Sequence, residues 1–192
     1  FTIVTDLPYD RPATTMADFE MCPVCRVEYT DPTNRRYPAQ PIACHDCGPR
    51  LKFHAVAGGV ATDAAVDPAT ATDPIDAATV DIDSGAVVAV KGIGGYQLCC
   101  DATSDAAVAT LRGRKARPDK PFAIMVADID AARRLAYVSD SEATQLTSPA
   151  RPVVLLRARP EATVSPLVAP GNPLLGIMLP SSPVHELLFA RG

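Results

Sequence analysis

Four cysteines in two closely spaced pairs constrain the fold of this chain more than any other feature. Cys22 and Cys25 form one C-x-x-C motif, Cys44 and Cys47 form a second, and eighteen residues separate the two. Each motif presents two thiols, and this separation is typical of structural zinc sites. A redox motif would need no second copy, and disulfides are disfavoured in a cytoplasmic protein. We therefore predict that these four cysteines bind one structural Zn2+ with no open coordination position.

Other polar residues near the two motifs give weaker patterns. His45 and His54 are not expected to be ligands, because four thiolates already satisfy the metal. Arg35, Arg36 and Tyr37 lie between the motifs and could contact nucleic acid. However, a broad nucleic-acid interface needs a basic face, whereas this chain has a net charge of −4 and a pI near 5.3. Nucleic acid is therefore not an expected partner.

Length and composition predict one medium domain with a small appended unit. The chain has 192 residues and is 47% hydrophobic, which is enough for a real core. A stretch rich in Ala, Thr, Asp and Gly divides it, so we predict a zinc-finger-like unit at 1–54, a linker at 55–78 and a larger domain at 79–192. No apolar run approaches the roughly 20 residues that span a bilayer, and we expect a cytoplasmic protein. Because the chain begins at Phe1 without Met, we also expect a piece of a longer protein.

The stretch 87–126 predicts a strand, a glycine turn, a strand, a helix, a basic loop and a strand. The apolar run Val87–Val90 ends in Lys91 and a glycine-rich turn that contains Gly94 and Gly95, where backbone can approach a ligand closely. A helix capped by Thr103 or Ser104 follows. It leads into a cluster of cations: Arg112, Arg114, Lys115, Arg117 and Lys120.

This basic cluster has two interpretations. Cations at the end of a helix can simply be solvated and complement the helix dipole. Alternatively, Pro118 and Pro121 stiffen the loop and Lys91 joins it, so that the charges converge on a phosphate.

Helices are predicted at 73–83, 128–136 and 139–146 and from Ser182, and strands at 51–60, 152–157 and 176–179.

Three further predictions concern individual side chains outside the basic cluster. His185 is expected to lie on the surface of its helix, whereas Cys99 and Cys100 are expected to be buried rather than reactive. The segment around Tyr9 and Phe19 is expected to be an extended linker packed by these two rings.

Two sequence stretches, KGIGGYQLCCDAT and LRGRKARPDKPFAIMV, resemble the YrdC-like domain of the HypF carbamoyltransferase family, and more distantly the Sua5/YrdC enzymes. The resemblance implies that Lys115 and Arg117 bind nucleotide phosphates and that Tyr96 is the family tyrosine. Arg151 matches an Arg-Pro element that precedes a family strand, and is a further phosphate candidate. A PYDRP segment like that of residues 8–12 lies between two zinc units in HypF proteins. The family's Ser-x-Asn element has no match after Leu179.

The resemblance also implies a function and a fold. The expected fold is a small four-cysteine zinc-binding unit followed by a YrdC-like α/β domain with a twisted mixed sheet, truncated at its C-terminal end. The implied reaction forms carbamoyl-adenylate from carbamoyl phosphate and ATP with Mg2+, and Lys91, Lys115 and Arg117 are the catalytic candidates. The carbamoyl group would pass to the C-terminal cysteine of a HypE-like acceptor in hydrogenase maturation. Acylphosphatase-like and transferase domains would belong to the parent chain.

Two other functions stay open at this point. One is a threonylcarbamoyl-adenylate synthase for tRNA modification, although the four-cysteine unit and the PYDRP segment speak against it. The other is a zinc-dependent binding module without catalysis, in which the basic cluster docks a protein or an RNA.

Overall fold

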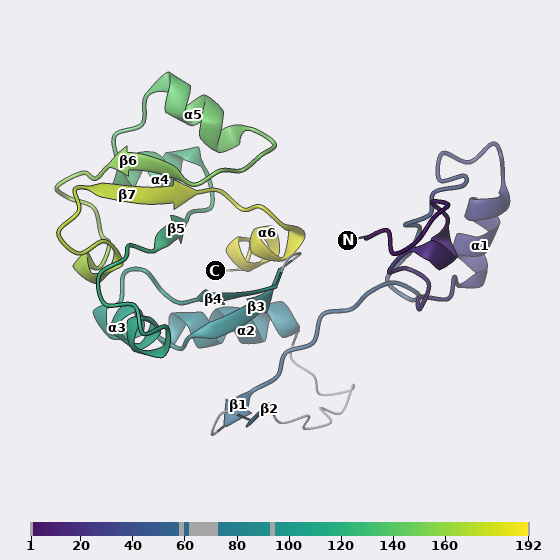
Figure 1. The fold of residues 1–192 in the computed structure, drawn as a ribbon, viewed down its shortest axis with the longest axis horizontal. Coiled ribbons are helices and arrows are strands. Elements are labelled where there is room, and N and C mark those ends of the chain that lie inside the picture. Colours follow the sequence, from purple (N-terminus) through teal and green to yellow (C-terminus); the bar gives the residue numbers. More distant parts are fainter. Residues whose placement is uncertain (1, 58–59, 62–72, 93–94, 192) are drawn as a thin grey trace. The chain divides into compact units, whose positions relative to one another are not determined.

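A computed structural model describes residues 2–57, 60–61, 73–92 and 95–191. The chain forms two compact units, residues 1–52 and residues 53–192, and each is described by itself (Figure 1). None of the helices in the described part of the chain is long and apolar enough to cross a membrane.

The first unit consists mostly of turns around one short helix, α1 (Pro23–Thr30), and a 3-10 turn, η1 (Arg11–Ala13). Buried Arg11 connects distant parts of this unit, because its guanidinium donates to the carbonyls of Gln40 (2.8 Å), Ile42 (2.8 Å) and Phe19 (2.6 Å). The expectation of a linker packed by Tyr9 and Phe19 is wrong for Tyr9, which is 54% exposed, whereas Phe19 is half-buried. A buried arginine bonded to carbonyls organises this segment instead.

The second unit begins with short pairs of strands. Strands β1 (Val56–Ala57) and β2 (Val60–Ala61) pair antiparallel, so two short strands replace the single strand predicted at 51–60. Strands β3 (Val88–Lys91) and β4 (Tyr96–Cys99) form the predicted hairpin, with Lys91 paired to Tyr96. The hairpin requires glycine at position 95, because the φ angle there is +147°.

Two helices accompany this hairpin, and their ends follow local sequence signals. Helix α2 (Pro74–Asp83) starts with Asp73 as its N-cap and Pro74 in its first turn. Helix α3 (Asp105–Arg114) is capped by Ser104, whose hydroxyl accepts from the backbone N–H of Ala107 at 3.3 Å. Both helices were predicted from these residues.

A three-stranded sheet forms the rest of the second unit. Its strands β5 (Ala123–Met125), β6 (Val154–Arg157) and β7 (Leu174–Met178) lie in the order β5-β7-β6. Strand β7 is parallel to β5 and antiparallel to β6, so the sheet is mixed, as predicted. The connections contain α4 (Ile129–Leu135), α5 (Asp140–Thr147) and η2 (Pro166–Val168), and α6 (Pro183–Phe189) follows β7.

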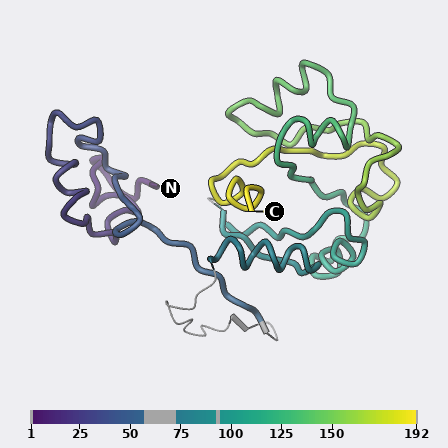
Figure 2. The backbone as a smooth tube through the Cα atoms, turned by 180° about the vertical axis from the view of Figure 1, so that it is seen from behind, coloured from purple at the N-terminus to yellow at the C-terminus, as the bar shows by residue number. Residues whose placement is uncertain are grey.

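The core of the second unit lies around the three-stranded sheet. Ile177 of β7, Leu156 of β6 and Leu146 of α5 are fully buried there, together with Ala132 of α4. Figures 1 and 2 show, from opposite sides, the β3–β4 hairpin with α2 and α3 as one group and the three-stranded sheet with α4 and α5 as another. Helix α6 contacts α2.

Candidate functional site

The four predicted metal ligands come together in the first unit. The sulfur atoms of Cys22, Cys25, Cys44 and Cys47 all lie within 4.8 Å of one another. The Cys22 sulfur also caps α1, because it accepts from the backbone N–H of Cys25 at 3.5 Å. The start of the helix therefore positions two of the four ligands.

The geometry and chemistry of this cluster fit zinc. A tetrahedral ion with Zn–S bonds of about 2.3 Å places its sulfur atoms about 3.8 Å apart. The Cys22–Cys44 and Cys44–Cys47 sulfur distances are 3.7 Å and 3.8 Å. Burial raises the pKa of the Cys25 thiol to about 12, so a thiolate here needs a neighbouring cation. The second C-x-x-C turn is tight, since a Cβ on Gly48 would lie 2.8 Å from the Cys44 carbonyl oxygen.

The buried side chain of Arg112 supports the basic loop that follows α3 in the second unit. Its side chain is 8% exposed, and its Nε donates to the Leu167 carbonyl at 2.5 Å. One Nη donates to the carbonyls of Arg117 (2.7 Å) and Pro118 (2.9 Å), and the guanidinium lies 4.8 Å from the centre of the Phe122 ring. These contacts fix the loop that follows α3. The structure therefore gives the Arg112 side chain a structural role. Its predicted contact with a nucleotide stays a prediction.

The loop turns at an unusual residue. Ala116 has a φ angle of +45°, a conformation that costs a residue with a Cβ about 1 kcal/mol. It separates Lys115, which is exposed, from Arg117, which is half-buried and donates to the Pro121 carbonyl at 3.0 Å. Strained backbone that the surrounding structure maintains is frequent at functional sites. Arg114 and Lys120 are exposed on either side of this turn.

The β3–β4 hairpin contains a further candidate cation, Lys91, which is not part of the basic loop. Exposed Lys91 at the end of β3 places its ammonium 4.9 Å from the centre of the Tyr96 ring, which is 71% exposed. Gly92 and Gly95 close the turn, because the Gly92 N–H donates to the Gly95 carbonyl at 2.7 Å. Gly94 lies outside the described residues.

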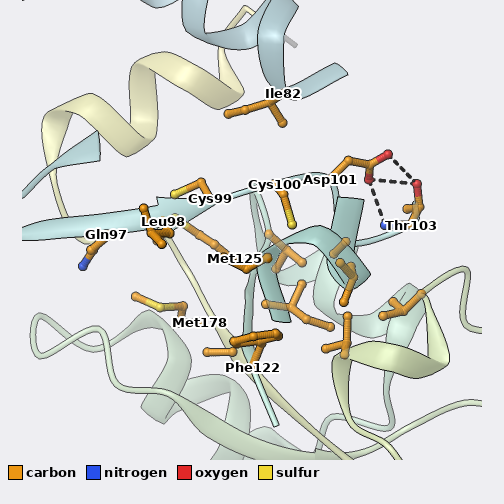
Figure 3. Close-up of a pocket in the computed structure, with 18 of the residues that line it drawn as sticks. Ile82, Gln97, Leu98, Cys99, Cys100, Asp101, Thr103, Phe122, Met125 and Met178 are labelled. Atoms are coloured by element: carbon orange, nitrogen blue, oxygen red, sulfur yellow. Dashed lines mark hydrogen bonds between the residues drawn. The ribbon is translucent and has the colours of Figure 1, made fainter. Parts of the chain in front are cut away.

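A cavity of about 740 Å³ lies beside the basic loop. Its lining is mostly apolar and comes from β4, α3, β5 and α6, and it includes Lys115 and Arg117 but not Lys91. Figure 3 shows Leu98 and Cys99 on one side of this cavity and Met178 on the other. Asp101 at its rim accepts from the N–H and the hydroxyl of Thr103, both at 2.8 Å.

Two residues that line this cavity each have a buried nitrogen atom without a hydrogen-bond partner. The atoms are Nε of Arg117 and Nε2 of His185, and the described residues contain no other buried side-chain nitrogen or oxygen of this kind. An acceptor that reached the Arg117 Nε would remove a desolvation cost of about 1–3 kcal/mol. The expectation of a surface histidine is wrong, since His185 is 3% exposed. Burial also lowers its pKa, so the imidazole is neutral at pH 7.

The remaining predicted residues have simpler surroundings. Cys99 and Cys100 are half-buried rather than fully buried as expected. Burial still raises the pKa of both thiols, which is typical of unreactive cysteines, and Lys115 partly offsets this effect at Cys99. Arg151 has a φ angle of +44° in the connection between α5 and β6. It does not line the cavity that Lys115 and Arg117 share, so the structure does not bring these three residues to one pocket.

Comparisons with known proteins place the chain in a family. Residues 81–192, more than half of the chain, match the Sua5/YciO/YrdC family, whose description reads "Telomere recombination". The chain belongs to the Sua5/YciO/YrdC family. Residues 21–54 match a second family, described as "HypF finger". The HypF finger therefore precedes the YrdC-like domain along the chain, which is the predicted order.

Carbamoyltransferases named HypF are similar to nearly the whole chain. The protein of Rhodobacter capsulatus is 49% identical over 98% of the chain, and that of Synechocystis is 41% identical over all of it. This YrdC-family chain spans about a quarter of the length of these relatives, 24% in both cases. The recognised resemblance to HypF is thereby confirmed.

Solved structures agree with this assignment. A full-length HypF in the phosphate- and nucleotide-bound form has a TM-score of 0.84 at 41% identity and covers 98% of the chain, which spans 23% of that protein. HypF of T. kodakarensis has a TM-score of 0.81 at 44% identity, with 97% and 24% of the two chains covered. Sua5 of P. abyssi has a TM-score of 0.52 at 22% identity over 61% of the chain and 35% of its own length, which shows a common fold alone.

Sequence reasoning missed the roles of three residues. It grouped Arg112 with the phosphate candidates, placed His185 on the surface and did not distinguish Ala116 from its neighbours. Only His185 had a usable signal, because a histidine just after a Ser-Ser-Pro helix start can turn toward the preceding serines. Its Nδ1 lies 3.4 Å from the Ser181 hydroxyl.

Proposed function

We propose that this chain is the nucleotide-binding part of a HypF-like carbamoyltransferase. The proposed reaction joins a carbamoyl group from carbamoyl phosphate to the AMP portion of ATP and releases pyrophosphate. The carbamoyl group then passes to the C-terminal cysteine of a HypE-like acceptor in the maturation of [NiFe]-hydrogenase. The observation that carries the proposal is the strained, arginine-supported loop with Lys115 and Arg117 beside a cavity, in a chain 49% identical to a HypF carbamoyltransferase.

In this proposal the loop binds the phosphates of ATP. Lys115 supplies a point charge and Arg117 a guanidinium fork, while Lys120 adds charge at the far side of the turn. Arg112 acts through the loop, because its hydrogen bonds end on the carbonyls of Arg117 and Pro118. Arg114 and Arg151 remain further phosphate candidates.

The chemical step needs position and charge more than a covalent nucleophile. Hydrolysis first breaks the bond between the carbamoyl group and the phosphate of carbamoyl phosphate, which gives carbamate and inorganic phosphate. A carbamate oxygen then forms a bond to the α-phosphorus of ATP, and the bond from that phosphorus to pyrophosphate breaks. Cations held at the loop stabilise the negative charge on the leaving pyrophosphate. Lys91, above the Tyr96 ring, and the backbone N–H groups of Gly94 and Gly95 would orient the carbamoyl end.

Two metal ions have different parts in the proposal. Zn2+ would be structural, since four cysteine sulfurs leave no position for a substrate. Mg2+ would accompany ATP, held largely by phosphate oxygens and water. Within the described ranges the four-cysteine cluster is the only group of three or more metal-ligating side chains.

The test is release of pyrophosphate from ATP that depends on carbamoyl phosphate. It is made with the chain alone and with the chain inside a polypeptide as long as its relatives. Lys115→Ala and Arg117→Ala should each lower the rate in the longer polypeptide by about 100-fold, as loss of a charge that stabilises the transition state does. Arg35→Ala, an exposed arginine of the zinc unit, should leave the rate unchanged. Unchanged rates in both loop variants would refute the assignment.

Two other functions have less support. A threonylcarbamoyl-adenylate synthase would share the phosphate loop, but the Sua5 likeness extends to the fold alone, and residues 21–54 match the HypF finger. L-threonine with bicarbonate in place of carbamoyl phosphate distinguishes this alternative, because the synthase would release pyrophosphate in response to that pair. A zinc-dependent binding module without catalysis predicts no pyrophosphate release with either substrate.

A further inference from the structure

Four arginines lie around the contact between the end of α4 and the end of β6, on a part of the second unit that the proposed reaction does not use. Arg133 and Arg134 end α4, while Arg157 and Arg159 lie at the end of β6, and we call these four residues the arginine cluster. Tyr137, whose ring lies near Arg157 and Arg159, is 47% exposed. None of the four arginines lines the cavity beside the basic loop.

The backbone holds this cluster in one arrangement. An antiparallel bridge joins Ala136 to Ala158, and the Tyr137 N–H donates to the Arg157 carbonyl at 2.9 Å. The Arg159 N–H donates to the Leu135 carbonyl at 2.9 Å. The end of α4 and the end of β6 are thus fixed to each other, so the backbone positions from which the four arginines extend need little ordering when a ligand binds.

The side chains also form a recess. The Arg159 guanidinium lies 4.6 Å from the centre of the Tyr137 ring, and that of Arg157 lies 5.8 Å from it. The Arg159 Nε donates to the Arg133 carbonyl at 2.7 Å. On the α4 side of Arg159 a hollow of about 500 Å³ is lined by Arg133, Arg134 and Arg159 together with Leu135, Glu161 and Thr163, whereas Arg157 and Tyr137 do not line it.

The acids around the cluster do not balance its charge. Asp130 lies 3.4 Å from Arg133, and Glu161 lies 3.5 Å from Arg159. Both pairs are largely solvent-exposed, and such pairs contribute little, so an incoming anion can replace them. Arg134 and Arg157 have no acidic partner within 4.0 Å in the part of the chain that the structure describes. The cluster is a concentrated positive patch on a chain of net charge −4.

We propose that the arginine cluster binds an acidic segment of a partner protein through several carboxylates. Guanidinium forks bind carboxylates with two parallel hydrogen bonds, and the unpaired arginines on α4 and β6 offer two such forks. A single-stranded nucleic acid fits less well. Its bases need an open aromatic face for stacking, whereas guanidinium groups already lie over the Tyr137 ring. The surface is also small and local, unlike the broad basic face of a nucleic-acid-binding protein.

The test measures fluorescence anisotropy of a labelled peptide, six consecutive glutamates with a glycine at each end, titrated with the zinc-loaded chain. The titration is made at about 50 mM salt, where surface charges are least screened. The double variant Arg134→Ala, Arg157→Ala should weaken binding about tenfold, the loss of two guanidinium–carboxylate pairs. The control double variant Arg26→Ala, Arg35→Ala removes the same charge from exposed positions of the other unit and should change binding less than about twofold.

Three outcomes would overturn this inference. The first is no binding of the glutamate peptide, or equal binding of the same peptide with glutamine in place of every glutamate. The second is an equal loss in the control double variant, which would assign the binding to overall charge. The third is tighter binding of a labelled 15-nucleotide polyuridine that depends on the same two arginines, which would assign the cluster to nucleic acid. Pyrophosphate release does not enter this measurement, so its result is independent of the proposed reaction.

Discussion

Removal of the Arg112 side chain should release the basic loop and destabilise the second unit. Arg112→Met keeps an unbranched apolar side chain against Phe122 but removes the donors to the carbonyls of Leu167, Arg117 and Pro118. Hydrogen bonds from a charged group contribute about 1.5–3 kcal/mol each, and the desolvation cost of burying the guanidinium offsets part of the sum. We therefore expect the free energy of unfolding to fall by about 3 kcal/mol.

Urea unfolding of the zinc-loaded chain, followed by far-UV circular dichroism, measures this loss. With a denaturant slope of about 2 kcal/mol per molar urea, the midpoint of the second unit should fall by about 1.5 M. Amide hydrogen exchange of residues 115–120 should accelerate by a larger factor than that of β7, because the loop loses its support directly. The matched control is Arg114→Met on the exposed face of the same helix, which should change stability by less than about 0.5 kcal/mol. A loss below about 1 kcal/mol with unchanged loop exchange would refute the structural role of Arg112.

Three further predictions concern the metal site, the turn and the buried histidine. Gly48→Ala should weaken zinc binding at least tenfold in a chelator competition, because the new Cβ meets the Cys44 carbonyl at 2.8 Å; equal affinity would contradict the tight second turn. Ala116→Gly should raise the thermal midpoint slightly and Ala116→Val should lower it, since only glycine tolerates a φ of +45° without strain, and the reverse order would refute that strain. Burial lowers the pKa of His185, so below about pH 6.5 the unfolded state binds the proton more readily and stability falls as pH falls. His185→Gln should flatten the stability profile between about pH 6.5 and 5, and an unchanged slope would show that the imidazole protonates equally in both states.

Local signals predicted the helices of this chain well. Asp73, Ser104 and Ser182 cap their helices, and Ser139 forms a capping box with Glu142. Hydrogen bonds from Ser139 lower the pKa of the Glu142 carboxyl below its usual range. These features depend on residues at most three positions apart, so the sequence contains all the information that they need. The zinc cluster was predicted for a similar reason, since the spacing of the ligands is itself the signal.

Long-range contacts explain what the sequence could not predict. Arg112 looked like one more cation in a basic run, but its main partner, Leu167, lies 55 residues further along the chain. The seven residues of α6 do not form enough turns to define a buried face, and Phe189 is 38% exposed while His185 is buried. The strand order β5-β7-β6 likewise depends on a crossover that periodicity does not encode.

The most direct test of a phosphate-binding loop is isothermal titration of ATP with Mg2+ into the zinc-loaded chain, alone and within a polypeptide of the length of its relatives. We predict binding in the longer polypeptide that weakens at least tenfold in both Lys115→Ala and Arg117→Ala, with Arg35→Ala unchanged as the control. The result for the chain alone then reports whether its 192 residues suffice to bind ATP. Binding of ATP by the longer polypeptide with the same affinity in both loop variants would contradict the account, because the phosphates would then lie elsewhere.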